Sequence, residues 1–123
     1  MRSRSEVILT DSLVVTISYI NVAVYDEKIK PEDMTGEQLA YAKKFCNCRA
    51  CHAMPTMPDA ESAGTIGPPL IAMQARYPDK AKLRAQIWNA LDANPASVMI
   101  PFGKNKVMTE QEIDKVTDFV YGL

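Results

Sequence analysis

The feature that most constrains this chain is the stretch Cys48-x-x-Cys51-His52. Two cysteines separated by two residues and followed directly by a histidine form the attachment pattern of a c-type haem. Two thiols one helical turn apart can each add to a vinyl group on one edge of the porphyrin. The adjacent imidazole can then bind the iron as the proximal ligand. The chain contains one histidine, which is His52, so the motif predicts a single covalently bound haem c.

Two other interpretations of the same cysteines stay open at this point. Cys46, Cys48, Cys51 and His52 together form a Cys3His set that could hold zinc. Structural zinc sites, however, usually combine ligand pairs from separated segments, and so compact a set would strain a tetrahedron. A redox dithiol is the other alternative, but no βαβ pattern surrounds the motif. If haem occupies the motif, Cys46 is left over and is expected to be a free thiol.

Length and charge limit the class of protein. With 123 residues the chain is long enough for one domain with a single core. A net charge of −1 provides no basic surface for nucleic acid, so no nucleic-acid partner is expected. Haem attachment of the c type takes place outside the cytoplasm. The motif therefore predicts a periplasmic, thylakoid-lumen or intermembrane location.

The first 24 residues are the most ambiguous part of the sequence. A basic start and the apolar run from Leu13 to Val24 have the outline of a secretory signal, although Asp11 and polar residues within the run weaken it. The alternation of β-branched and other residues favours extended structure instead. The apolar run is too short for a membrane span. We therefore predict an arm or degenerate leader over residues 1–24, followed by one haem-binding domain over residues 25–123.

Three amphipathic helices are predicted in that domain, each with a capping residue. Thr35 with Gln38 and Thr109 with Glu112 have the spacing of capping boxes, and Asp79 can cap the helix between them. Stretches rich in proline and glycine separate the helices and indicate loops. The expected apolar positions are Leu39, Ala42, Phe45 and Cys46 in the first helix, Leu83, Ile87 and Leu91 within Lys80–Asp92, and Ile113, Val116, Val120 and Leu123 in the last. This pattern predicts an all-α fold.

A low-spin haem iron needs a sixth ligand, and methionine is the ligand that raises the reduction potential. Seven methionines are present, and most are poorly placed by sequence. Met54 and Met57 follow His52 too closely to reach the opposite face, and Met73 is better explained by packing. Met99 lies in a loop punctuated by proline, where a rigid backbone can hold a thioether on the iron. We expect Met99 to be the distal ligand and keep Met108, directly before the Thr109 cap, as the alternative.

The order of these motifs resembles the class I cytochromes c. The shared features are the haem motif, then Gly67-Pro68-x-Leu70, Arg76, Met99-x-x-Phe102 and a terminal helix. The resemblance implies that the Pro68 carbonyl accepts the second N–H of His52, that Leu70 packs on the ring and that Arg76 binds a haem propionate. Arg76 as an ordinary solvated cation is the alternative. Trp88 could donate its indole N–H to a propionate or fill the core.

A narrower similarity is to SoxX, the monohaem subunit of the SoxAX cytochrome in periplasmic thiosulfate oxidation. It covers roughly Asp26 to Leu123. Cys46 departs from it, since a small residue such as glycine is expected there. The motifs that carry it are Asn47-Cys-x-x-Cys-His-Ala-Met-Pro55, Gly64-Thr-Ile-Gly-Pro-Pro-Leu70, the stretch from Arg76 to Trp88, Asn94-Pro95, Val98-Met-x-Pro-Phe-Gly-Lys104 and Thr109-Glu-x-Glu-Ile113.

This similarity implies one-electron transfer by a haem with His/Met ligation, in a periplasmic heterodimer with a SoxA-like cytochrome. That complex would join thiosulfate oxidatively to a cysteine of the carrier SoxYZ, with a downstream cytochrome c as electron acceptor and the catalytic site on the partner. A free-standing electron shuttle is the alternative, and a haem sensor or peroxidase with an open sixth position is another. We expect the partner to contact the apolar stretches Met54–Met57 and Ile100–Gly103.

Overall fold

The computed structural model describes residues 29–57 and 64–123. Every element described below lies in one compact unit, residues 31–123. Its helices are, in order, η1 (Pro31–Asp33), α2 (Gly36–Tyr41), η2 (Cys48–Ala50), α3 (Met73–Arg76), α4 (Lys80–Trp88), α5 (Ala90–Ala93) and α6 (Glu110–Tyr121), where η marks a 3-10 helix. The described ranges contain no strand, which confirms the predicted all-α fold there. The arm or leader expected over residues 1–24 lies outside the described residues.

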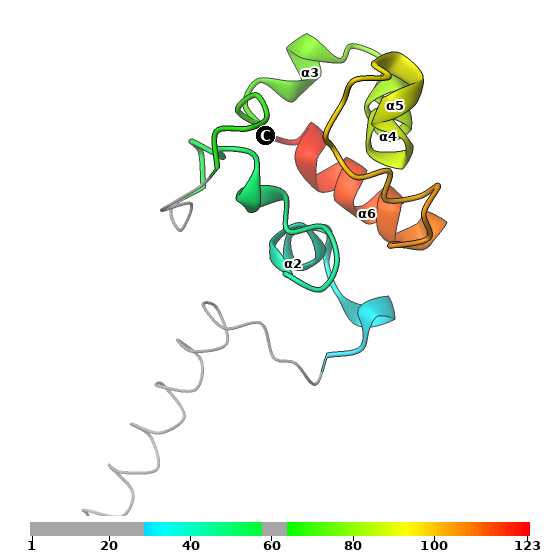
Figure 1. Ribbon diagram of the computed structural model, residues 1–123. Helices are drawn as coiled ribbons and strands as arrows, with labels where there is room; N and C mark the ends of the chain where they lie inside the picture. Colours follow the sequence, from blue (N-terminus) through cyan, green and yellow to red (C-terminus); the bar gives the residue numbers. More distant parts are fainter. Residues whose placement is uncertain (1–28, 58–63) are drawn as a thin grey trace, which may run out of the picture. The chain divides into compact units, whose positions relative to one another are not determined.

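Helix α6 provides the central apolar surface of this unit. The predicted capping box is present: the Thr109 hydroxyl accepts from the backbone N–H of Glu112 at 3.2 Å, and the Glu112 carboxylate accepts from the Thr109 N–H at 2.7 Å. Ile113, Val116 and Val120 are buried, as their spacing predicted. Helices α2 and α4 both pack against α6, as Figure 1 shows. The core therefore forms where these three helices meet.

The first helix is shorter than predicted. Its capping box of Thr35 and Gln38 is present, but α2 ends at Tyr41 because Ala42 turns to an extended conformation with φ −66° and ψ 121°. The carbonyl of Ala42 then accepts from the N–H groups of Phe45 and Asn47, which closes a turn. The prediction that this helix includes Ala42, Phe45 and Cys46 is wrong. A turn replaces it and redirects the chain ahead of the motif.

The helix predicted over Lys80–Asp92 is divided in two. Asp79 caps it as expected, accepting from the Ala81 N–H at 3.0 Å, and Asn94 ends it. Asn89, however, has φ −155° and ψ 92°, which separates α4 from α5. The short helix α3 was not predicted. It follows Ala72, whose φ of 51° lies in the left-handed region.

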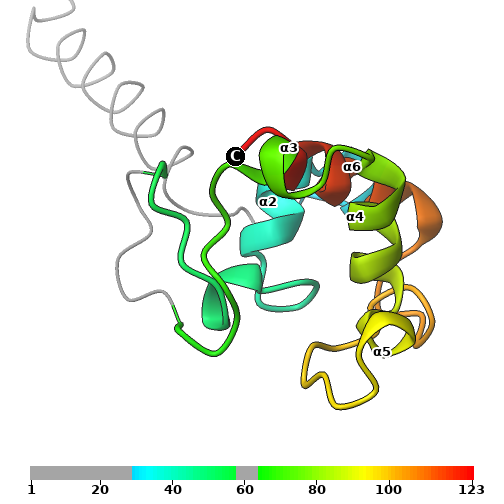
Figure 2. The same ribbon diagram turned by 90° about the horizontal axis from the view of Figure 1, so that it is seen from above.

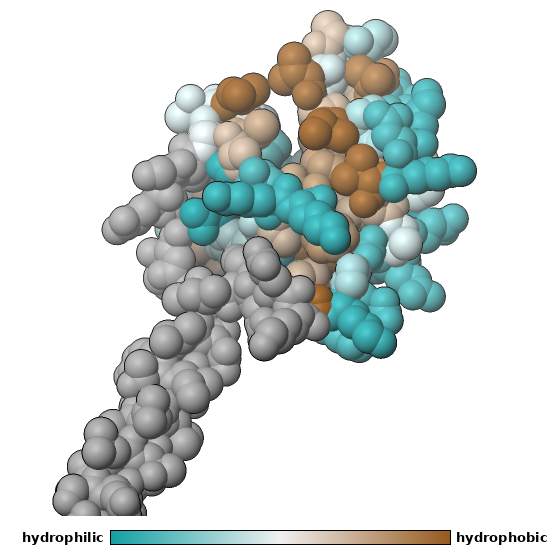
Figure 3. Space-filling view, turned by 60° about the horizontal axis from the view of Figure 1, so that its bottom comes forward, coloured by the Kyte–Doolittle hydropathy of each residue, from teal (hydrophilic) through white to brown (hydrophobic). Residues whose placement is uncertain are grey.

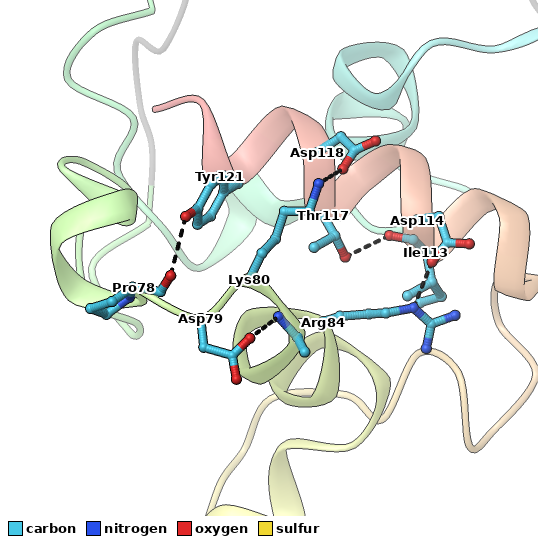
Figure 4. Close-up of polar contacts among 10 residues, drawn as sticks. Pro78, Asp79, Lys80, Arg84, Ile113, Asp114, Thr117, Asp118 and Tyr121 are labelled. Atoms are coloured by element: carbon cyan, nitrogen blue, oxygen red, sulfur yellow. Dashed lines mark hydrogen bonds and ion pairs between the residues drawn. The ribbon is translucent and has the colours of Figure 1, made fainter.

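Ion pairs across the surface align α4 with α6 (Figure 4). The Lys80 ammonium donates to Asp118 at 2.6 Å, and Arg84 donates to Asp114 at 2.5 Å. The hydrogen bond to Asp118 raises the pKa of Lys80. Because these side chains are largely exposed, such pairs are expected to contribute little to stability. They join α4 to α6 across the surface.

None of the helices in the described ranges combines the length and the apolar character needed to cross a bilayer.

We predict that Thr109→Ala destabilises the protein by about 1 kcal/mol, because it removes a capping box from the helix that carries the core. Denaturant unfolding followed by circular dichroism measures the effect. Thr109→Ser is the matched control, since serine retains the capping hydroxyl and should stay close to the wild type. Equal stability of the alanine and serine variants would contradict the prediction.

Candidate haem-binding site

The haem motif forms a single tight turn. Asn47, with φ 43°, leads into the 3-10 helix η2. The Cys48 carbonyl then accepts from the N–H groups of both Cys51, at 3.2 Å, and His52, at 2.9 Å. This turn gathers the two thiols and the imidazole along one wall of a cavity. The three cysteines are free thiols.

A second segment runs alongside the motif and holds it in place. The N–H of Gly64 donates to the Arg49 carbonyl at 2.8 Å, that of Gly67 to the Cys51 carbonyl at 2.8 Å, and that of Leu70 to the Ala53 carbonyl at 2.7 Å. Three successive bonds of this kind fix the two segments against each other without forming a regular sheet. The loop that contains Pro68 therefore lies directly beside the imidazole.

His52 is oriented by the contact that the family resemblance implies. Its Nδ1 lies 2.7 Å from the Pro68 carbonyl oxygen. Because a carbonyl can only accept, Nδ1 must carry the proton, and Nε2 is left with a lone pair for a metal ion. Such a hydrogen bond to the ring nitrogen opposite the metal fixes the tautomer and increases the basicity of the ligand.

Gly67 contacts the His52 ring, a role that the sequence analysis did not predict. A Cβ atom at this position would lie 2.3 Å from Cε1 and 2.6 Å from Nδ1 of His52. Only a residue without a side chain lets the imidazole lie so close to the loop. The glycine before Pro68 was the sequence signal, but its contact with the ring depends on the tertiary structure.

The cavity has a volume of about 650 Å³ and is lined from two sides. Figure 2 shows the haem motif and the segment after residue 63 on one side, with the loop that follows α5 on the other. Most of its walls are apolar. The buried side chains that line it from α3, α4 and α6 are Met73, Leu83, Ile87, Val116 and Val120.

The structure brings seven of the eight predicted site residues to this cavity. These are Cys48, Cys51, His52, Pro68, Leu70, Arg76 and Met99. Trp88 does not line it. Its indole instead packs against Gly103, and the Arg84 guanidinium lies 5.7 Å from the centre of its ring. This placement favours packing over propionate binding for Trp88, and the ligand roles of the other residues stay predictions.

The methionines differ in where their thioethers lie. Met99 lines the cavity and is half-buried, whereas Met108 is buried in the core and does not line it. Met73 also lines the cavity, but its sulfur accepts a hydrogen bond from Arg76 at 3.3 Å. Of the two candidates left open by sequence, the placement favours Met99.

The Arg76 side chain is held in place by two hydrogen bonds. Its Nη1 donates to the Pro69 carbonyl at 2.5 Å as well as to the Met73 sulfur. The side chain is exposed and lines the rim of the cavity. A fixed cation at the edge of an apolar cavity can pair with a carboxylate of a bound molecule.

Cys46 is buried beside the attachment cysteines. A hydrogen bond with the Cys48 thiol, together with burial, raises the pKa of Cys46 well above its ordinary value. In the parts of the chain that the structure describes, no group of three or more His, Cys, Asp or Glu side chains is arranged to hold a metal ion.

The partner surface expected from sequence is partly buried. Met54 is 0% exposed and Phe102 only 5%, so neither can form an outer contact. The large apolar residues that are exposed along the cavity are Ile66, at 71%, Val98, at 80%, and Ile100. Figure 3 shows apolar side chains gathered on one face of the molecule, bordered by hydrophilic ones. We call Ile66, Val98 and Ile100 the apolar rim.

The fold has a counterpart among solved structures. The chain is similar to a chain in the crystal structure of SoxXA from P. pantotrophus, with a TM-score of 0.63 and 26% sequence identity over 70% of this chain and 77% of that one. No known protein-family model matches the chain, and no curated protein sequence matches it. The two chains are thus similar in fold, and their sequence identity is low.

We predict that Gly67→Ala, in protein that carries haem, displaces the His52 ring and weakens its hydrogen bond to Pro68. A histidine that donates less strongly to Pro68 is a weaker ligand for oxidised iron, so the reduction potential should rise. Overpacking of this kind also costs about 1–3 kcal/mol of stability. Redox titration and denaturant unfolding measure the two effects.

Gly122→Ala is the control, because a Cβ there would approach no atom more closely than 3.4 Å. It should leave both quantities unchanged. A Gly67→Ala protein with the wild-type reduction potential would show that the glycine does not position the ligand.

Proposed function

We propose that this protein transfers single electrons through one covalently bound haem c, ligated by His52 and Met99. The observation that carries this proposal is the cavity itself. It brings together two free thiols one turn apart, an imidazole whose Nε2 is left free by the bond to Pro68, and the thioether of a distant loop.

The residues fit this cofactor in chemistry and in size. Cys48 and Cys51 supply the thiols for attachment, and the largely apolar walls suit a flat apolar ring. The volume of about 650 Å³ is within the range of cofactor sites, roughly 300–1,000 Å³. When bound, the haem would supply a reversible one-electron couple.

The protein has three tasks around such a group. His52, held in one tautomer by Pro68, provides a fixed proximal ligand. Buried side chains of α4 and α6 form an apolar cavity floor, and Met99, which lines the cavity, would supply the second ligand of the iron. Arg76, fixed on the Pro69 carbonyl, can pair with a propionate. With His52 and Met99 both bound to the iron, the site would favour electron transfer over the binding of small ligands.

The likeness to a SoxXA chain supports a cytochrome of a Sox complex. Within that class we propose the SoxX-like role. The protein would form a periplasmic heterodimer with a SoxA-like cytochrome and would accept electrons as thiosulfate is joined to a cysteine of the carrier SoxYZ. A downstream cytochrome c would then receive these electrons. The bond-forming site would lie on the partner.

We predict that Met99→Ala abolishes the Met-to-iron charge-transfer band of the oxidised protein and opens the iron to cyanide and to CO. The reason is that no other group then fills the sixth position. Visible and near-infrared spectra of protein matured with haem measure the change. Met108→Leu is the control, because it alters a core methionine of similar volume that lies away from the cavity. A band that survives Met99→Ala would exclude Met99 as the ligand.

We also predict that Val98→Glu weakens binding to a SoxA-like partner by about 1–3 kcal/mol, because it places an unpaired charge on an apolar contact surface. The spectrum should not change. Val107→Glu is the control, since Val107 is exposed but does not line the cavity. Calorimetry or surface plasmon resonance measures the affinity. Equal binding by both variants would favour a free-standing electron shuttle or a different docking surface.

A further inference from the structure

We propose that Trp88 and Gly103 form a clamp that positions Met99 in the cavity. This inference rests on the proposed function, in which Met99 binds the iron. Neither residue of the clamp lines the cavity. Both would therefore act on the distal ligand through the loop that connects α5 to α6.

The break in the helix at Asn89 makes the clamp possible. In a continuous helix the Trp88 carbonyl would accept from the N–H of Asp92, four residues later. Here the Asp92 N–H donates to the Asn89 carbonyl instead, at 3.2 Å. The Trp88 carbonyl is thereby freed, and it accepts from the N–H groups of Gly103, at 3.1 Å, and Lys104, at 3.2 Å. Two bonds thus join the far end of the Met99 loop to the end of α4.

The Trp88 ring itself also packs against Gly103. A Cβ atom at Gly103 would lie 2.0 Å from Cε3 and 2.2 Å from Cδ2 of the indole. The backbone of the loop therefore rests directly on the ring face, where no side chain can fit. The ring has support of its own, because the Arg84 guanidinium lies against it and donates to Asp114 on α6.

Hydrogen bonds within the rest of the loop connect Met99 to the clamp. The Asn94 side chain accepts from the Ala96 N–H at 3.1 Å at the start of the loop, and the Ser97 hydroxyl accepts from the Met99 N–H at 3.2 Å. Phe102, next to the clamp, is buried. Because Met99 lies only four residues before Gly103, displacement of the clamp shifts the thioether while His52 keeps its bond to Pro68.

The test is Gly103→Ala in the protein with its haem attached. The added methyl group collides with the indole, so the Met-to-iron band of the oxidised protein should be lost at a lower temperature than in the wild type. Cyanide should bind faster, roughly tenfold for a distortion of this size. Hydrogen exchange of the backbone amides at positions 103 and 104 should accelerate. Gly122→Ala, with no close neighbour for its Cβ, should match the wild type in all three measurements.

Rescue distinguishes a steric clamp from general damage. Trp88→Leu removes the atoms that the new methyl group meets, so the double variant Gly103→Ala/Trp88→Leu should bind cyanide more slowly than the two single effects added together predict. Additive effects would overturn the clamp. If Gly103→Ala does not yield folded protein, Trp88→Leu alone tests the clamp. Loss of the Met-to-iron band at a lower temperature than in the wild type supports the clamp, and loss at the wild-type temperature overturns it.

The clamp and the proposed function fail in different ways. A wild-type protein without the Met-to-iron band would remove Met99 from the iron and refute the proposed ligation, whatever the variants do. A wild-type protein with the band, together with a Gly103→Ala protein that holds it equally well, would refute the clamp alone.

Discussion

The site depends first on the hydrogen bond between His52 and the Pro68 carbonyl. It links the haem motif to the segment that follows residue 63, and it decides which ring nitrogen carries the proton. The three backbone bonds between these segments place the carbonyl, and Gly67 allows the ring to approach it. The chemistry of the imidazole is therefore set by the backbone of a loop, and a change in the loop changes the ligand.

The parts of the fold governed by local rules could be predicted from the sequence. Thr35, Asp79 and Thr109 cap helices as expected, because a capping hydrogen bond joins residues only two or three positions apart. The apolar stripe of α6 was equally readable, since helical spacing defines one face.

The interruptions of the helices were not predictable in this way. Asn89 divides the predicted helix, and Ala42 ends the first one early. Neither position carries a proline or a glycine, and the one local signal is that asparagine is a poor helix former. At Asn89 the break is accompanied by a contact distant in sequence, since Gly103 and Lys104 donate to the Trp88 carbonyl that the break releases. A tertiary contact overrides helix propensity here.

For some residues the sequence allowed two roles or locations, and only the structure distinguishes between them. The indole of Trp88 could serve a propionate or the core, and its packing against Gly103 favours the core. Phe102 belongs to an apolar stretch that was expected at the surface. It is buried, whereas Ile100 in the same stretch is exposed. Hydrophobicity alone does not say which apolar side chains of a loop face inward.

The two proposed ligands, His52 and Met99, are held by similar means but with different redundancy. On the proximal side, His52 belongs to a turn that three backbone bonds tie to the neighbouring segment, and its ring has a bond of its own. On the distal side, Met99 is carried by a loop whose far end is tied to α4 at a single carbonyl, that of Trp88. If Met99 binds the iron as proposed, loosening the contacts at Trp88 would release the thioether, whereas releasing the imidazole would require the bonds of a whole segment to fail together. Loss of the methionine ligand would then be the change that this fold permits most easily.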